Sequence, residues 1–362
     1  MSDVSARATT SADQAAPAPL AGVTTLHLGG PPHRLVIATN ANETVQSVRA
    51  AALRDERILV LSGGSNVVIA DEGFAGTVVL LRSRGVRVVA DEGESVTVRV
   101  EAGEPWDDVV AFAVANGWSG IECLSGIPGG TGATPIQNVG AYGQEVAETV
   151  TGIEAYDRVA DEVAVLTPEQ CGFAYRSSVF RHNDRWVVLG VEFTLAHSPM
   201  SAPIRYAELA RALGVPVGDR VPLADARAAV LALRAGKGMV LDAEDPDTRS
   251  VGSFFTNPVL DADAYAALLE RAGALGEPPS WPGRNGLVKV SAAWLIERAG
   301  FGKGYGGRGG VAISSKHTLA LTNRGGGSTA ALLDLAREIR DGVHSRFGVT
   351  LHPEPVLVGC EL

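Results

Sequence analysis

The strongest constraint on the fold of this chain is a glycine-rich segment with a defined set of other residues, IPGGTGATPIQNVGAYG at positions 127–143. Its five glycines allow positive φ angles and a close approach of the backbone to a ligand. Successive backbone N–H groups in such a segment can form an anion-binding nest. Gln137 and Asn138 add amide donors and acceptors. The segment therefore indicates a loop that holds a phosphate-bearing cofactor.

A second glycine loop lies upstream, LSGGSN at positions 61–66, directly after the apolar run 58–60. A strand followed by glycines is a common way to bind phosphate groups. Two such loops favour an extended ligand such as a dinucleotide. The alternative for either loop is a tight turn that binds nothing.

Length and composition exclude several classes of protein. The 362 residues are enough for two or three domains. We find no apolar run of the roughly 20 residues that span a bilayer, so we expect no membrane partner. The first twenty residues, rich in Ala, Ser, Thr and Pro, are typical of a disordered tail rather than a secretory signal, which favours a cytoplasmic location.

The net charge and the cysteines argue against two further kinds of partner, nucleic acid and metal ions. A net charge of −10 opposes a general affinity for nucleic acid. The three cysteines, Cys123, Cys171 and Cys360, form no CxxC pair, which predicts reduced, packed thiols and no metal site.

The pattern of apolar residues predicts a mixed fold, α+β or α/β, in at least two parts. A hairpin is expected where 86–89 and 96–100 alternate apolar and polar residues. Short Pro- and Gly-containing connections at 198–203 and 215–221 suggest a domain junction near residue 235. The other expected elements are helices over 42–54, 105–115, 167–172, 291–299 and 329–347 and strands over 57–61 and 76–81.

Two further motifs are rejected. Gly304, Gly306 and Gly309 satisfy GxGxxG, but they follow a predicted helix instead of a strand, and no helical pattern opens after them. No GxxxxGK[ST] sequence occurs, which disfavours a P-loop nucleotidase.

Five separated motifs together resemble the UDP-N-acetylenolpyruvoylglucosamine reductase family of bacterial cell-wall precursor synthesis. They occur in the family's order and span about residues 24–359: LSGGSN at 61–66, GIPGGTGATPIQNVGAYGQE at 126–145, AYRSSVF at 174–180, GSFFTNP at 252–258 and HPEP at 352–355.

The resemblance implies a vanillyl-alcohol-oxidase-type FAD-binding fold over residues 21–235, in two subdomains that divide near residue 85. It also implies a C-terminal α/β domain over 236–362 that binds the substrate, with a last strand near 350–359 that returns toward the flavin. FAD would be bound tightly but without a covalent bond, NADPH would be the co-substrate, and a UDP-sugar would be the substrate. We expect a monomer or weak dimer.

The chemistry of the reaction suggests roles for particular residues. Hydride addition to the terminal vinyl carbon of an enolpyruvyl ether leaves negative charge on the neighbouring carbon and its carboxylate. Arg176 can donate a fork of hydrogen bonds to a carboxylate, and a protonated Glu354 can donate another. By resemblance these two residues stabilise the enolate, and Ser253 donates the proton to carbon. Taken singly, each has an ordinary alternative: a surface ion pair, a strand-end carboxylate and a helix cap.

The resemblance and the glycine loops assign the remaining site residues. Residues expected to contact the nucleotide or cover the substrate are Tyr175, Tyr206, Lys237, Asn257, Lys289 and His317. Residues expected to bind the cofactor are Gly63, Gly64, Ser65, Asn66, Gly132, Ala133, Thr134, Ile136, Gln137, Asn138, Gly140 and Arg234.

The chain also departs from the family pattern. Val356 and Thr256 stand where relatives often carry a basic residue, so two anion contacts are in question, and Arg234 could replace part of them. Two other functions stay open: a flavin oxidase of the same fold, and a flavin- or nucleotide-binding protein without catalysis.

Overall fold

The computed structural model describes residues 17–362. Most of the tail expected over 1–20 lies outside the described residues. The expectation is wrong for Leu20, which is buried, begins a short 3₁₀ helix over Leu20–Val23, and donates its N–H to the Gly30 carbonyl. An apolar side chain within a proline- and alanine-rich stretch thus belongs to the core.

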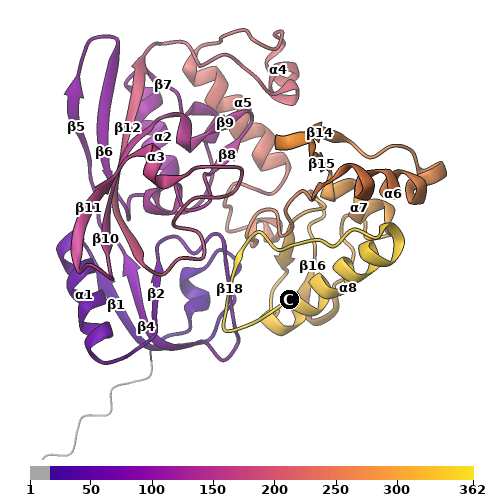
Figure 1. Cartoon of the computed structure of the whole chain (residues 1–362), viewed down its shortest axis with the longest axis horizontal. Helices are drawn as coiled ribbons and strands as arrows, with labels where there is room; N and C mark the ends of the chain where they lie inside the picture. Colours follow the sequence, from indigo (N-terminus) through magenta and orange to yellow (C-terminus); the bar gives the residue numbers. More distant parts are fainter. Residues whose placement is uncertain (1–16) are drawn as a thin grey trace, which may run out of the picture.

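The first part of the chain forms a small parallel sheet in the order β1-β4-β2, with helix α1 packed against it (Figure 1). Asn40 caps α1 by accepting a hydrogen bond from the Glu43 N–H. The predicted helix and two strands of this region are confirmed within one or two residues. The elements are β1 (Pro32–Ala38), α1 (Ala41–Leu53), β2 (Ile58–Leu61), β3 (Val67–Ile69) and β4 (Phe74–Leu81).

A second sheet contains six strands, in the order β11-β10-β12-β6-β5, with β7 paired to β12. The expected hairpin is β5 and β6, whose alternating residues Val96, Val98 and Val100 are buried. The elements are β5 (Val86–Asp91), β6 (Ser95–Glu101), α2 (Trp106–Ala115), β7 (Trp118–Ser119), β10 (Val150–Asp157), β11 (Glu162–Leu166), α3 (Pro168–Cys171) and β12 (Trp186–His197).

Two helices that the sequence analysis did not anticipate, α4 (Ala207–Leu213) and α5 (Leu223–Gly236), pack on this second part (Figure 1). Their apolar residues form a cluster that includes Leu209, Val230 and Cys123. The predicted junction near residue 235 therefore coincides with the end of α5.

The C-terminal part packs small sheets against three helices (Figure 1). The predicted stripe on the last helix is confirmed, because Leu332, Ala336, Ile339, Val343 and Phe347 are all buried. Its elements are β13 (Val259–Leu260), α6 (Ala262–Ala272), β14 (Ser280–Pro282), β15 (Val288–Val290), α7 (Ala292–Arg298), β16 (Val311–Ile313), β17 (Leu321–Asn323) and α8 (Thr329–Phe347).

The chain end joins the two parts. Strand β18 (Val356–Val358) lies parallel to β3, so the C-terminus returns to the glycine loop that precedes β3 (Figure 1). Asp71, directly after β3, accepts hydrogen bonds from the N–H groups of Thr329 and Ala330 at the start of α8. These contacts fix the site between the two parts.

Candidate active site

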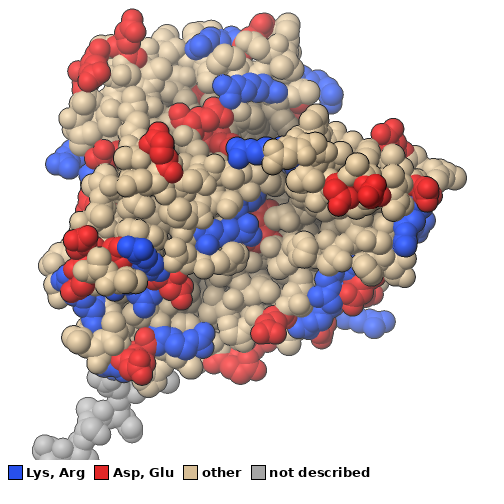
Figure 2. Space-filling model, in the orientation of Figure 1, with Lys and Arg blue, Asp and Glu red and all other residues tan. Residues whose placement is uncertain are grey.

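A cavity of about 490 Å³ lies between the glycine loops and the C-terminal part, and its size is within the range of cofactor and ligand sites. Figure 2 shows the corresponding face hollowed between the two parts, with Lys and Arg side chains in and around the hollow. The predicted residues that line the cavity are Gly63, Gly64, Ser65, Asn66, Ala133, Thr134, Ile136, Gln137, Gly140, Arg176, Tyr206, Arg234, Lys237, Ser253, His317 and Glu354.

The two glycine loops pack directly against each other. A Cβ on Gly63 would lie 2.6 Å from the Gly129 Cα atom, and the Ser65 hydroxyl donates a 2.9 Å hydrogen bond to the Pro128 carbonyl. Gly64 has a φ of +57°, and a Cβ there would lie 2.2 Å from the Val23 carbonyl oxygen. The backbone packing of the protein therefore requires glycine at both positions.

Polar groups of these loops remain available to a ligand. The backbone N–H groups of residues 63–66 donate to no other backbone carbonyl in the described part of the chain. Among residues 17–362, the buried Oε1 atom of Gln137 and the buried Nε atom of Arg234 also have no hydrogen-bond partner. Buried polar groups are normally paired, so this donor-rich wall fits a cofactor that carries phosphates and a polar ring system.

Arg176 and Glu354 form an ion pair, with the Arg176 Nε atom 3.0 Å from the Glu354 Oε1 atom. The short helix α3, with its Thr167–Gln170 capping box and left-handed Gly172, leads the chain to the turn that carries Arg176. Arg176 itself has a φ of +50°, a conformation that is costly for a residue other than glycine and that is often found at functional sites.

Burial raises the pKa of Glu354 and outweighs the opposing effect of Arg176. The carboxyl group thus favours its protonated form more than an exposed glutamate does. A protonated Glu354 can accept from Arg176 with one oxygen and donate from the other.

Ser253 and Glu354 lie on two adjacent extended segments. The Glu354 N–H donates to the Phe254 carbonyl at 2.8 Å, and the Thr256 N–H donates to the His352 carbonyl at 3.1 Å. The Gln137 side-chain amide donates to the Glu354 carbonyl at 3.1 Å. Residues about 100 positions apart in sequence are thereby held at one wall of the cavity.

The opposite wall carries a cluster of aromatic and charged residues. The Tyr206 ring packs edge-on against Tyr142, with the ring centroids 5.6 Å apart. The Lys237 ammonium lies 2.7 Å from Glu208 and 5.6 Å from the Tyr142 ring centroid. Burial, with Lys237 and Lys303 nearby, lowers the pKa of His317 to about 4, so its imidazole is neutral near pH 7.

Five predicted residues do not line this cavity. Tyr175 lines a smaller neighbouring pocket of about 300 Å³, and the Lys289 ammonium lies 4.7 Å from its ring centroid. Asn257 accepts a hydrogen bond from the Ala292 N–H at the start of α7. These three residues form the outer edge of the site.

Gly132 and Asn138 have internal roles in the structure. A Cβ on Gly132 would lie 2.5 Å from that of Ala102. The Asn138 amide donates to Glu145 and to the Ala174 carbonyl, and its oxygen accepts from the Ala147 N–H. Both residues support the loop and do not line the cavity. Gly132 leaves room for Ala102, and the side chain of Asn138 forms its hydrogen bonds within the protein.

Two residues of this cluster, Tyr142 and Glu208, are not among the predicted site residues. Tyr142 lies within the glycine segment and has a φ of +48°, but only the tertiary structure brings it to Tyr206. Glu208 follows Tyr206 by two residues, and no pattern in the sequence linked it to Lys237.

The two departures from the family pattern also have a place in the structure. Val356 lines the cavity, and its N–H donates to the Asn66 carbonyl at 3.0 Å. Thr256 lies outside the cavity, with its hydroxyl 3.4 Å from the His352 carbonyl. Arg234 lines the cavity with a free Nε atom, so it is available to an anionic group.

Other features of residues 17–362 bear on function. The three cysteines are free thiols. The GxGxxG match at 304–309 leads into strand β16 and not into a helix. No helix in this part of the chain is both long and apolar enough to cross a membrane.

Comparison with known proteins identifies close relatives. Residues 245–358 match the UDP-N-acetylenolpyruvoylglucosamine reductase C-terminal domain, and residues 32–164 match an FAD binding domain. A UDP-N-acetylenolpyruvoylglucosamine reductase of Salinispora arenicola is 69% identical over 345 residues, which cover 95% of each chain. The enzyme of that name from Thermobifida fusca is 58% identical over 348 residues, covering 95% of this chain and 98% of the relative.

A solved structure has the same fold. The crystal structure of the UDP-N-acetylenolpyruvylglucosamine reductase from Thermus caldophilus matches with a TM-score of 0.65 at 23% identity, covering 94% of this chain and 97% of the other. The expected mixed fold with an FAD-binding region in its first half is confirmed.

Proposed function

The chain belongs to the UDP-N-acetylenolpyruvoylglucosamine reductase family, and we propose that Arg176, Ser253 and Glu354 carry out its reaction. This reaction is the NADPH- and FAD-dependent reduction of UDP-N-acetylglucosamine enolpyruvate to UDP-N-acetylmuramate in peptidoglycan precursor synthesis. One observation carries the assignment: three segments far apart in sequence bring these residues to one cavity together with both glycine loops.

When bound, FAD would accept the hydride of NADPH and pass it to the substrate. The residues of the chain then act on the substrate. Arg176 binds the substrate carboxylate and, with protonated Glu354, stabilises the negative charge that develops there. Ser253 donates its hydroxyl proton to the carbanionic carbon, and solvent restores that proton.

The loops supply the cofactor site. We propose that the free N–H groups of residues 63–66 hold the phosphates and that Gln137 binds the flavin ring system. Lys237 lines the cavity as a cation for the substrate diphosphate, and Arg234 serves the cofactor and replaces part of the anion contacts missing at Thr256 and Val356. Tyr206 covers the substrate from the α4 side, and His317, Tyr175, Asn257 and Lys289 complete its binding site.

The proposal is tested with the purified protein. We expect a yellow flavin spectrum, bleaching on anaerobic addition of NADPH, and restoration of colour when the enolpyruvyl substrate is added. Recovery of colour in air but not with the substrate would instead indicate an oxidase. A protein that cannot be reconstituted with FAD would contradict both functions.

The finer features of the protein are also proposals. We propose a cytoplasmic monomer or weak dimer, with an FAD-binding region over 21–235 that divides near residue 85 and a substrate-binding domain over 236–362. The division near residue 85 is supported by the connection between β4, which ends at Leu81, and β5, which begins at Val86. Sedimentation velocity of the holoenzyme tests the oligomeric state.

A further inference from the structure

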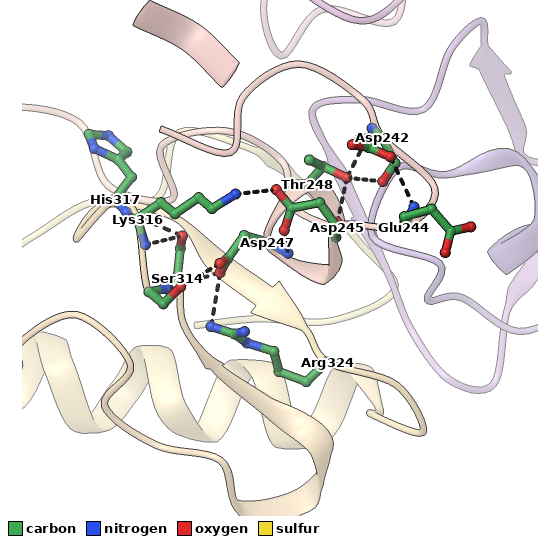
Figure 3. Close-up of polar contacts among 10 residues, drawn as sticks. Asp242, Glu244, Asp245, Asp247, Thr248, Ser314, Lys316, His317 and Arg324 are labelled. Atoms are coloured by element: carbon green, nitrogen blue, oxygen red, sulfur yellow. Dashed lines mark hydrogen bonds and ion pairs between the residues drawn. The ribbon is translucent and has the colours of Figure 1, made fainter. Parts of the chain in front are cut away.

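Three of the proposed site residues reach the cavity from segments that converge on one buried carboxylate, Asp247. Lys237 precedes Gly238, where a Cβ would lie only 3.0 Å from the Asp247 Cβ atom. Ser253 follows Asp247 by six residues on the same strand-free segment. His317 lies on the turn between β16 and β17, which bonds directly to Asp247 (Figure 3).

Asp247 holds this turn through two hydrogen bonds. The Ser315 N–H donates to its Oδ1 atom at 2.9 Å, and the Ser315 hydroxyl donates to its Oδ2 atom at 2.6 Å. The buried Ser314 hydroxyl accepts hydrogen bonds from the N–H groups of Lys316 and His317. These hydrogen bonds hold the turn, and the His317 side chain points away from Asp247, as Figure 3 shows.

The carboxylate is charged although it is only 3% exposed. Burial favours its neutral form, but the hydrogen bonds from Ser315 and the charge of Arg324 keep the pKa of Asp247 below its usual range. The Arg324 Nη2 atom lies 2.9 Å from the Oδ1 atom. Such a buried, paired charge requires a fixed geometry, since loss of one partner leaves the other uncompensated.

We infer that Asp247 is a positioning residue for the reductase reaction, which holds the turn 314–317 against the segment that bears Ser253 and so keeps the His317 imidazole in the cavity. One part of the inference rests on the proposed function, namely that His317 contacts the substrate. The hydrogen bonds from Ser315 to Asp247 are independent of that role.

The test compares Asp247→Asn with a matched control, Asp242→Asn. Asparagine has the same size, but it loses the charge opposite Arg324 and cannot accept at both positions. Asp242 is exposed on the same segment, and its carboxylate accepts only from the Glu244 N–H among the described residues. Flavin content and thermal unfolding of each holoenzyme report whether the variant is folded.

We expect kcat/KM for the enolpyruvyl UDP-sugar to fall about tenfold to a hundredfold in Asp247→Asn, through a higher KM, because a small displacement of a binding group is costly. Asp242→Asn should match the unchanged protein. If Asp247 acts through His317, the double variant Asp247→Asn/His317→Asn should lose no more than His317→Asn alone. Additive losses would overturn the inference.

A second measurement does not depend on turnover. We expect NMR titration of histidine labelled at Cε1 to show the pKa of His317 rising from about 4 toward its ordinary value in Asp247→Asn, because the imidazole gains access to water. The charged groups that act on this imidazole, Lys237, Lys303, Glu208 and Glu297, are unchanged by the substitution. An unaltered titration would overturn the inference even in an inactive protein.

Two outcomes separate this inference from the proposed function. If His317→Asn turns over normally while the titration of His317 shifts in Asp247→Asn, Asp247 fixes the turn 314–317 but serves no step of the reaction, which overturns the inference and leaves the roles proposed for Arg176, Ser253 and Glu354 untouched. If Asp247→Asn does not fold, Ser315→Ala is tested instead, because it removes only the side-chain hydrogen bond to Asp247. It should lower kcat/KM and raise the pKa of His317 by smaller amounts. Unchanged readouts in Ser315→Ala would then contradict the inference.

Discussion

At the scale of single residues, the site depends on groups whose protonation and geometry are set by their neighbours. Arg176 combines a left-handed backbone, an ion pair with Glu354 and a hydrogen bond from its Nη2 atom to the Gly140 carbonyl at 3.1 Å. A guanidinium can make these contacts and still offer a donor to the substrate. An ammonium has no planar fork of donors.

We therefore expect Arg176→Lys to lower kcat/KM for the enolpyruvyl substrate by about a hundredfold or more, the loss of roughly one strong transition-state contact. Bleaching by NADPH in the absence of substrate should remain, which stopped-flow absorbance can measure. Near-normal turnover in this variant would remove Arg176 from the active site.

Ser253 is proposed to act in only one half of the reaction. Ser253→Ala should bind FAD and be bleached by NADPH at close to the normal rate, while reoxidation by the substrate should slow by ~10²–10⁴ because the acid is lost. Ser253→Cys should recover part of the rate, since a thiol can also donate a proton. Equal slowing of both halves in stopped-flow experiments would assign Ser253 a structural role.

The raised pKa of Glu354 predicts the pH dependence of the reaction. The protonated carboxyl is the active form, so kcat/KM should be highest below this pKa and fall as the pH rises through it. Glu354→Gln keeps a donor that does not titrate, and its pH–rate profile should lose that alkaline fall. A profile with the same fall in both proteins would show that another group titrates.

At the scale of elements, the two glycine loops act as one packed unit. Gly64 and Gly93 both have positive φ, but an added Cβ meets the Val23 carbonyl at Gly64 and nothing within 4 Å at Gly93. The comparison of these two positions separates the cost of the backbone conformation from that of the steric clash.

We expect Gly93→Ala to retain FAD and lose about 1 kcal/mol of unfolding free energy. Gly64→Ala should lose flavin as well, because the loop must move to relieve the clash. Flavin absorbance per protein after gel filtration measures the difference. Equal flavin retention in the two variants would show that the close packing of Gly64 does not support the cofactor site.

At the scale of the whole molecule, strand β18 connects the C-terminal part to the glycine loops through its pairing with β3. Val358 is only 7% exposed there, whereas Val259 on β13 is 46% exposed. Val358→Asp should lower the melting temperature and the FAD content together, since it buries an unpaired carboxylate. Val259→Asp should change neither. Differential scanning calorimetry with flavin quantification checks both, and a Val358→Asp variant that kept native flavin content would show that β18 does not support the cofactor loop.

Short-range patterns in the sequence predict many of the local elements, and the motifs suggest which groups are reactive. The capping residues of α1 and α3, the stripe on α8 and the hairpin β5–β6 depend on short-range periodicity and hydrogen bonding. The motifs that resemble the family include Arg176, Ser253 and Glu354, which all line the cavity.

Which of these groups meet, and which only support others, depends on the packing of distant segments. Helices α4 and α5, the contact of Tyr142 with Tyr206 and the burial of Asp247 depend on packing between segments far apart in the chain. The same is true of the glycines, since sequence indicated their freedom of φ but not the backbone that each one approaches. Burial and pairing are properties of three-dimensional neighbours, so the charge states of Glu354 and His317 follow from the fold and from no local pattern.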